Sequence, residues 1–148
     1  MTDLYTCNAL RIIQSADLLK ARLSGEFSAV HGLSVNEFFL LMHLERAPLS
    51  RLSRVELARR MHVSASTVTR MVAPMEKLGL LGRDADARDA RSTLVVLTET
   101  GRTRLAEARE TFARQAGYAF EDRWDKGELA QLADLLARLV AGTPSNLS

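Results

Sequence analysis

The sequence predicts a mainly α-helical fold with one small β-hairpin, an α+β chain of about one domain. Apolar residues recur at helical spacing through most of its 148 residues, and capping residues stand at the start of several of these segments. Only two short β-prone runs interrupt the pattern, and both lie in the second half of the chain. The expected order is one helix, a three-helix core, a hairpin and two further helices.

The first helical segment is expected from residue 3 to about residue 30, where His31-Gly32 ends it. It carries a broad apolar stripe made of Ala9, Leu10, Ile13, Ala16, Leu18, Leu19 and Ala21. Ser34 begins the second helix, because Glu37 follows three residues later in the spacing of a capping box, and Pro48 ends it. The expected buried face of this helix consists of Phe38, Leu41, Met42 and Leu44.

The capping signal recurs at Ser53 and Glu56, where a third helix starts. The inner face of this helix is expected to consist of Val55, Leu57, Ala58 and Met61, whereas Arg59 and Arg60 point more outward. After a turn at His62-Val63, Ser64 caps a helix that runs to about Leu78, and Gly79 stops it.

Pro74 lies inside this helix, about ten residues past its N-cap. Proline removes a backbone donor and crowds the preceding turn, at a cost of about 3 kcal/mol or more in a regular interior. We favour a kinked single helix. The alternative is a helix over residues 64–73 followed by a separate turn over residues 75–78.

Leu80-Leu81 and the run from Thr93 to Leu97 are the two β-prone segments, and the residues between them suit an exposed hairpin loop. Thr98 caps the next helix, which runs to about Tyr118 or Glu121. Asp125 with Glu128 marks the start of a last helix. The tail from Gly142 to Ser148 is expected to be frayed.

The two ends of the chain carry more apolar surface than a unit of this size needs for itself. Leucines of the last helix share one side: Leu129, Leu132, Leu136 and Leu139, with Val140. We expect the terminal helices to pack together and to bury part of this surface in a second copy of the chain, which gives a homodimer. The expected divisions are residues 1–32 and 101–148 for dimerisation, with a central lobe over residues 33–100.

Composition limits the class of protein. Apolar residues make up 47% of the chain and charged residues 26%, as in ordinary soluble globular domains. The chain has no run of about 18 uncharged apolar residues such as a membrane span requires, and no secretory signal is evident at its start. Its single cysteine excludes an internal disulfide. We expect a cytoplasmic protein that does not bind membranes.

Positive charge is concentrated in the middle of the chain. From Arg51 to Arg91, nine basic residues face five acidic ones, a net charge of +4, whereas the remainder carries −2. This distribution indicates one face that binds a polyanion. The alternative is a solvated surface of mixed charge.

The central segment resembles the MarR family of winged helix-turn-helix transcription regulators. The resemblance covers most of the chain and is carried by five pieces: E-L-A-R-R-M (56–61), V-S-A-S-T-V-T-R (63–70), E-K-L-G-L (76–80), D-A-R-D-A-R (86–91) and V-x-L-T-x-x-G (95–101). It implies a winged helix-turn-helix flanked by N- and C-terminal dimerisation helices. It also implies a dimeric regulator, most often a repressor, that reads a pseudo-palindromic site in double-stranded DNA and responds to a ligand or redox signal.

Base readout requires exposed side chains at the start of the recognition helix. Arg70 is the first candidate, since arginine makes paired hydrogen bonds to guanine. The neighbouring candidates are Ser64, Ala65, Ser66 and Thr69, with Thr67 weaker. For the hydroxyls of Ser66 and Thr67 the alternative is local hydrogen bonding at a helix start.

Arginines of the hairpin loop are candidates for the minor groove, whose narrow form attracts guanidinium groups. By resemblance, Arg91 is the first choice and Asp89 the acid that orients it, with Arg88 and Asp86 second. The alternative is salt-bridge chemistry within the hairpin. Phosphate contacts are expected from Arg51, Arg54, Arg59, Arg60, Lys77 and Arg83, of which about half are expected to be simple solvated charges.

The remaining chemically active residues give weak signals. Cys7 invites a redox-sensor interpretation, but a buried, inert thiol is the commoner case. His31, His43 and His62 show no metal-ligand spacing, and no cofactor is expected. Tyr118, Phe120 and Trp124 are expected to pack in the helical dimer region.

The motifs of the sequence bear on three classes of function. No G-x-S-x-G, P-loop, H-E-x-x-H or dinucleotide fingerprint is present, so an enzyme is not expected. A winged helix used for protein interaction stays open beside the DNA-binding regulator, and a small aromatic molecule is a candidate effector.

Overall fold

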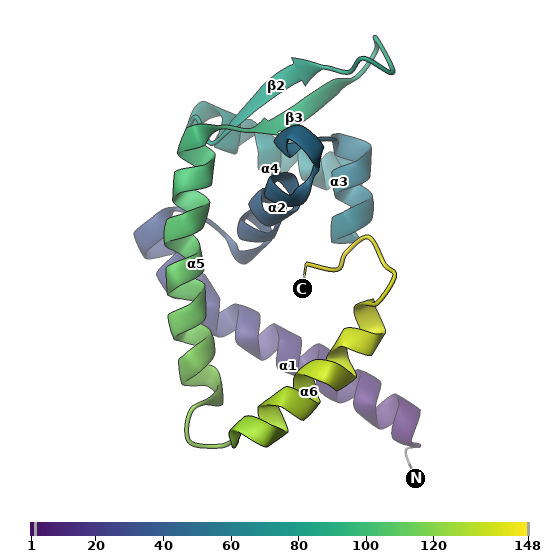
Figure 1. Ribbon diagram of the computed structural model, residues 1–148, viewed down its shortest axis with the longest axis vertical. Helices are drawn as coiled ribbons and strands as arrows, with labels where there is room; N and C mark the ends of the chain where they lie inside the picture. Colours follow the sequence, from purple (N-terminus) through teal and green to yellow (C-terminus); the bar gives the residue numbers. More distant parts are fainter. Residues whose placement is uncertain (2, 148) are drawn as a thin grey trace.

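The computed structural model describes residues 1 and 3–147, and α-helices account for most of them (Figure 1). The helices are α1 (Leu4–Glu26), α2 (Val35–Arg46), α3 (Arg54–Met61), α4 (Ala65–Lys77), α5 (Glu99–Phe120) and α6 (Lys126–Val140). The strands are β1 (Arg51–Ser53), β2 (Leu81–Ala85) and β3 (Thr93–Leu97). A π-helical turn at Phe27–His31 joins α1 to α2, and a 3-10 turn at Pro48–Ser50 joins α2 to β1.

Side-chain caps fix where these helices begin, as the sequence predicts. At α2, α3, α4 and α5 a hydroxyl accepts the backbone N–H three residues on; these caps are Ser34, Ser53, Ser64 and Thr98. Asp125 and Glu128 form a reciprocal box at the start of α6. Each cap satisfies a donor that a helix start leaves without an intrahelical partner, so local chemistry sets the boundaries.

The strands form one antiparallel sheet in the order β1-β3-β2. Leu81 pairs with Leu97 and Ala85 with Thr93, so β2 extends four residues beyond the predicted Leu80-Leu81 run. β1 was not predicted: Leu52 pairs with Val95, more than forty residues later. Three residues carry too little alternation to be recognised as a strand when the partner is so distant.

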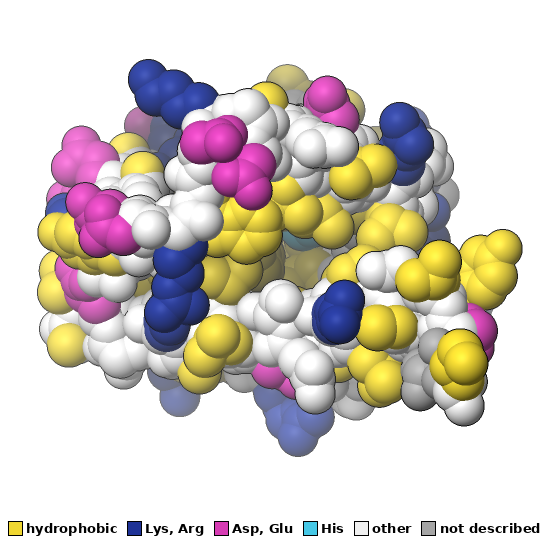
Figure 2. Space-filling view, turned by 90° about the horizontal axis from the view of Figure 1, so that it is seen from below, with side chains coloured by type: hydrophobic (Ala, Val, Ile, Leu, Met, Phe, Trp, Pro, Cys, Tyr) yellow, Lys and Arg dark blue, Asp and Glu magenta, His cyan; other side chains and the backbone are white. Residues whose placement is uncertain are grey.

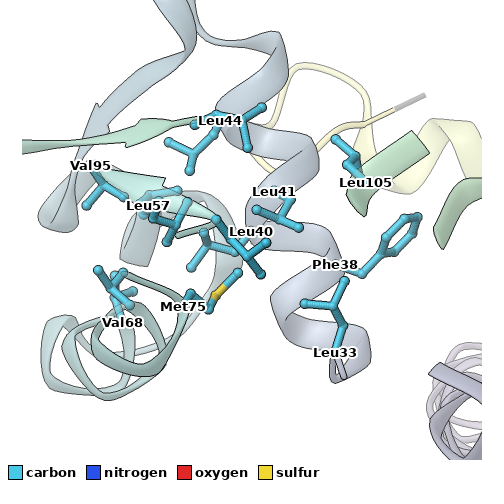
Figure 3. Close-up of a cluster of buried hydrophobic side chains, with 14 of the residues drawn as sticks. Leu33, Phe38, Leu40, Leu41, Leu44, Leu57, Val68, Met75, Val95 and Leu105 are labelled. Atoms are coloured by element: carbon cyan, nitrogen blue, oxygen red, sulfur yellow. The ribbon is translucent and has the colours of Figure 1, made fainter. Parts of the chain in front are cut away.

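A single apolar core joins α2, α3, α4, the sheet and α5 (Figure 3). Its fully buried members include Phe38, Leu40, Leu41, Leu44, Leu57, Val68, Met75 and Leu105. Leu40 was not predicted to be buried, and Met42 is only half-buried. Val55 was predicted to point inward but is 72% exposed, because it lies on the side of α3 that turns away from α2 and α4. The core holds α4 by one face and leaves the other to solvent.

The end of the first helical segment is confirmed, whereas the prediction for the tail is wrong. α1 ends at Glu26 and continues directly into the π-helical turn up to His31, and Gly32 then adopts a left-handed conformation that ends the segment. The tail was expected to be frayed, but residues 144–147 are half-buried. The hydroxyl of Ser145 contacts Nε2 of His62, which ties the tail to the turn between α3 and α4.

The long helix α5 runs from the sheet at one end of the molecule to α1 and α6 at the other (Figure 1). Seen from that end, apolar side chains gather around a hollow (Figure 2). Exposed apolar residues of the terminal helices include Leu10, Ile13, Leu18, Leu135, Leu136 and Leu139. No described residue of α6 is fully buried. None of the helices within the described residues is both long and apolar enough to cross a membrane.

Candidate nucleic-acid interface

The outer face of α4 carries the polar side chains predicted to read bases. Val68, Val72 and Met75 are fully buried beneath the helix. Helical spacing then leaves the opposite face to solvent, where the exposed residues are Ala65, Ser66, Thr69 and Arg70. The predicted division of α4 into an inner and an outer face is confirmed, whereas contact of the outer face with DNA stays a prediction.

Hydroxyl groups at the start of α4 are linked to one another. The Oγ of Ser64 accepts the backbone N–H of Thr67 at 3.1 Å. It also lies 2.8 Å from the Thr67 hydroxyl and 3.0 Å from that of Ser66. Arg70 donates from Nη2 to the Thr67 hydroxyl at 3.3 Å. Thr69 instead donates to the backbone oxygen of Ala65 at 3.1 Å, within its own helix.

Pro74 does not divide this helix. α4 is continuous from Ala65 to Lys77, so the alternative of two separate segments is wrong. The missing backbone donor of Pro74 falls one turn beyond Arg70, towards the end of the helix. Gly79 takes a positive φ of 77° just past the helix, as a C-terminal stop requires.

The loop between β2 and β3 is built on two aspartates. Asp86 accepts the backbone N–H of Arg88 at 2.9 Å and the hydroxyl of Ser92 at 3.0 Å, and these bonds hold the pKa of its carboxyl below the ordinary value. Asp89 accepts the backbone N–H of Arg91 at 2.9 Å. Both carboxylates therefore shape the turn, and Asp89 holds the backbone of Arg91 rather than its guanidinium.

The two loop arginines present free guanidinium groups. Arg88 and Arg91 are exposed, and neither guanidinium has an ion-pair partner among the residues that the structure describes. The alternative of salt bridges within the hairpin does not apply to Arg91, whereas the positive charge of Arg88 acts on Asp86 and helps to lower its pKa. Their charge is available to an external anion.

Most of the predicted phosphate contacts have acidic partners. Arg59 and Arg60 both pair with Glu56, at 2.6 Å and 2.9 Å, and these hydrogen bonds lower the pKa of Glu56 to about 2. Arg83 pairs with Glu76 at 2.9 Å, and Arg51 with Asp84. Such pairs hold the guanidinium groups in place.

Arg54 and Lys77 differ from the other four. Arg54 is half-buried, and Nη1 donates to the Thr93 hydroxyl at 3.4 Å. Its Nε is buried without a hydrogen-bond acceptor in the described part of the chain. Lys77 is exposed at the end of α4, on the same helix as the reading face.

A second feature lies between the lobe and the terminal helices. A mostly apolar, partly open cavity of about 280 Å³ is lined by α1, α2 and α5. Its walls include Leu23, Val35, Phe39, Phe112 and Phe120, with Lys20, Arg22 and Gln115 among the polar residues. The sequence alone does not predict this lining, because residues from three separate helices meet only in the fold.

The candidates for metal or redox chemistry, the histidines and the cysteine, lie apart from one another. His31 lies 2.6 Å from the Thr111 hydroxyl in the interior, and His43 is buried in α2. Burial, followed by the positive charges of Arg60 and Arg46, lowers the pKa of His43 to about 4. Cys7 is half-buried on α1. Within residues 1 and 3–147, His, Cys, Asp and Glu side chains form no group of three that could hold a metal ion.

The aromatic residues near the α5–α6 turn form a small cluster. The rings of Phe120 and Trp124 meet edge to face with centroids 6.2 Å apart. Tyr118 is 61% exposed beside them, at an open depression that all three help to line. Their packing in a helical dimer region stays a prediction.

Comparison with known proteins gives a consistent result. Residues 31–92 match the model of the MarR family. The HTH-type transcriptional regulator YdgJ of Bacillus subtilis is 30% identical over 119 residues, which cover 77% of this chain and 68% of YdgJ. The HTH-type transcriptional repressor YetL of the same organism is 30% identical over 116 residues, or 76% of this chain and 70% of YetL.

Solved structures share the fold. Sco3205, a MarR family regulator from Streptomyces coelicolor crystallised with DNA, has a TM-score of 0.79 at 24% identity, over 96% of this chain and 89% of that one. A MarR family regulator from Rhodococcus sp. RHA1 reaches 0.83 at 20% identity, over 97% and 99%. CouR from Rhodococcus jostii RHA1, bound to p-coumaroyl-CoA, has a TM-score of 0.75 at 22% identity, over 97% and 98%.

Proposed function

The chain belongs to the MarR family of helix-turn-helix transcription regulators, and we propose that it acts as a repressor. The proposed active form is a homodimer that binds a pseudo-palindromic operator. In each subunit α4 enters the major groove and the loop between β2 and β3 reaches the adjacent minor groove. Because such a regulator acts on chromosomal DNA, we place it in the cytoplasm.

The observation that carries this proposal is the arrangement of α4. Three fully buried apolar side chains anchor the helix, while Ser66, Thr69 and Arg70 stand together on its free face. Arginine is the side chain that most often pairs with guanine O6 and N7 in the major groove. The similarity to the YetL repressor and to the DNA-bound Sco3205 supports DNA binding by this chain.

The hairpin loop supports minor-groove contact. Asp86 and Asp89 tie the turn to itself through backbone hydrogen bonds, so the loop holds its shape without its guanidinium groups. Arg91 and Arg88 then carry unpaired positive charge at the tip of a ribbon, where a narrow minor groove would attract it. Arg91 is the first candidate by its place in the family motif.

A dimer is proposed because the terminal helices expose many apolar side chains to solvent. Leu135, Leu136 and Leu139 of α6 are 40–61% exposed, and α1 exposes several further aliphatic residues. A contiguous apolar surface of this kind on a helical scaffold is typical of a subunit interface. Dimer packing of α1, α5 and α6 would place two lobes around one twofold axis, and palindromic operators mirror that symmetry.

A small aromatic acid is the proposed effector, and the cavity between α1, α2 and α5 is its proposed site. The walls contain three phenylalanines, and Lys20 and Arg22 have no acidic partner among the described side chains. CouR with bound p-coumaroyl-CoA supports a ligand-responsive regulator. Because the cavity lies between the lobe and the dimer helices, an occupant would alter the separation of the two lobes.

The direct test is footprinting of the purified protein on the promoter of its own gene, repeated with a panel of small aromatic acids and oxidants. The proposal expects a protected segment with twofold symmetry that is released by one of the added compounds. Protection must weaken steeply with salt, because each neutralised phosphate releases counterions. Absence of protection at low salt would favour the alternative of a winged helix used for protein interaction.

A further inference from the structure

We infer that Thr67 is a positioning residue for Arg70, and that base discrimination by Arg70 depends on the hydroxyl chain from Ser64 through Thr67. This rests on the proposed DNA-binding function and assigns a division of labour within it. Arg70 would read the base, whereas Thr67 would hold the guanidinium in the orientation that makes reading selective.

The geometry consists of three successive contacts at the start of α4. Arg70 Nη2 donates to the Thr67 hydroxyl at 3.3 Å, one helical turn earlier. The Thr67 hydroxyl lies 2.8 Å from that of Ser64, which in turn lies 3.0 Å from that of Ser66. Ser64 is fixed by its role as the N-cap, since it also accepts the backbone N–H of Thr67.

The chemistry of the groups fixes the direction of the contact on which the inference depends. A guanidinium only donates, so the Thr67 oxygen accepts from Arg70, whereas either hydroxyl can donate in the contact between Thr67 and Ser64. Ser64 also accepts the backbone N–H of Thr67, and either hydroxyl can donate in its contact with Ser66. Ser66 stands on the exposed face, where a phosphate or base oxygen could accept from its hydroxyl.

Capping alone does not explain the Thr67 hydroxyl. The N-cap needs only the Ser64 oxygen and the Thr67 backbone, and valine would give the same branched shape at position 67. Thr69 shows the ordinary alternative, because its hydroxyl donates to the backbone of its own helix. The link from Thr67 to Arg70 has a different consequence: it reduces the number of rotamers available to an exposed arginine before DNA arrives, which favours binding in one orientation.

The test is a double-mutant cycle in the full-length protein. Thr67→Val, Thr67→Ser, Arg70→Ala and the double variant Thr67→Val/Arg70→Ala are titrated against the promoter duplex that footprinting identifies, and against duplexes with each base pair of one half-site replaced. The readout is the discrimination ratio, the Kd for a replaced duplex divided by the Kd for the intact one. Thr103→Val, an exposed threonine of α5 away from α4, is the matched control for the substitution itself.

We expect Thr67→Val to lower discrimination at the base pair that Arg70 reads by about two- to tenfold, the effect of one hydrogen bond. Thr67→Ser keeps the hydroxyl and should retain wild-type discrimination, as should the control Thr103→Val. In the Arg70→Ala background, Thr67→Val should have no further effect on discrimination. A general loss of helix stability would instead lower affinity equally in both backgrounds and would overturn the inference. Wild-type discrimination in Thr67→Val would also overturn it. Failure of the wild-type protein to bind any duplex would refute the proposed function instead.

Discussion

At Gly101, α5 approaches the backbone of Leu80, the residue just before β2, very closely. Replacing this glycine by alanine should therefore be severely destabilising. A Cβ at this position would lie 2.1 Å from the backbone oxygen of Leu80 and 2.8 Å from Cδ1 of Leu97. Backbone cannot rotate out of the way as a side-chain end can. The two segments would have to separate by about 0.9 Å to reach even a 3.0 Å contact.

The same separation would break the hydrogen bonds that join Leu80, just before β2, to Thr98, just after β3. The Leu80 oxygen accepts the backbone N–H of Thr98 at 3.2 Å and its hydroxyl at 2.9 Å. Forced backbone shifts cost about 1–3 kcal/mol, and each hydrogen bond contributes about 0.5–1.5 kcal/mol. We therefore expect Gly101→Ala to lower the free energy of unfolding by about 2–4 kcal/mol.

Urea and thermal unfolding at one protein concentration provide the assay, with Gly117→Ala as the control. Gly117 is in the same helix, but a Cβ there meets nothing within 4 Å. Alanine should stabilise the helix at that position by about 0.5–1 kcal/mol, because glycine is the poorer helix former. The reasoning would be refuted if the two variants unfolded alike, since helix propensity would then be the only effect of either change.

Two further outcomes follow from the interface, and a third follows from the buried His43. Arg70→Ala should cost about 1–3 kcal/mol of DNA-binding free energy and relax base preference at one position of each half-site; in gel-shift titrations, full retention of both would remove α4 as the reading helix. Arg91→Ala should weaken binding across most sequences and reduce the salt slope by about 1, and an unchanged slope would remove Arg91 from the minor groove. His43, with a folded-state pKa of about 4 against an ordinary 6.5, binds its proton more weakly in the native protein than in the unfolded chain. Its contribution should therefore leave stability constant above pH 6.5 and reduce it as pH falls towards 4. His43→Gln should flatten this decline in acid-unfolding curves, whereas parallel curves for the two proteins would contradict the assignment.

Local chemistry made much of the fold predictable. Ser34, Ser53, Ser64 and Thr98 each cap the helix expected of them, because a cap is formed between residues only three apart. The inner and outer faces of α4 follow from helical spacing for the same reason. Gly79 likewise ends its helix where predicted.

Features that depend on distant partners were missed. β1 is a strand only because β3 lies beside it, and Val55 is exposed because of where α2 and α4 lie relative to α3. The pairing of Arg51 with Asp84 and the lining of the α1–α2–α5 cavity also join residues far apart in sequence. No local pattern carries these contacts, so the candidate effector site could not be located before the fold.

The central claim is that two copies of this chain hold one duplex between paired reading lobes. Sedimentation velocity of the protein mixed with the footprinted promoter duplex, at low salt and dilute concentration, tests it most directly. The account predicts a complex that contains two chains for each duplex, formed from a dimer that exists before DNA is added. Single subunits that sediment apart from the duplex would contradict it.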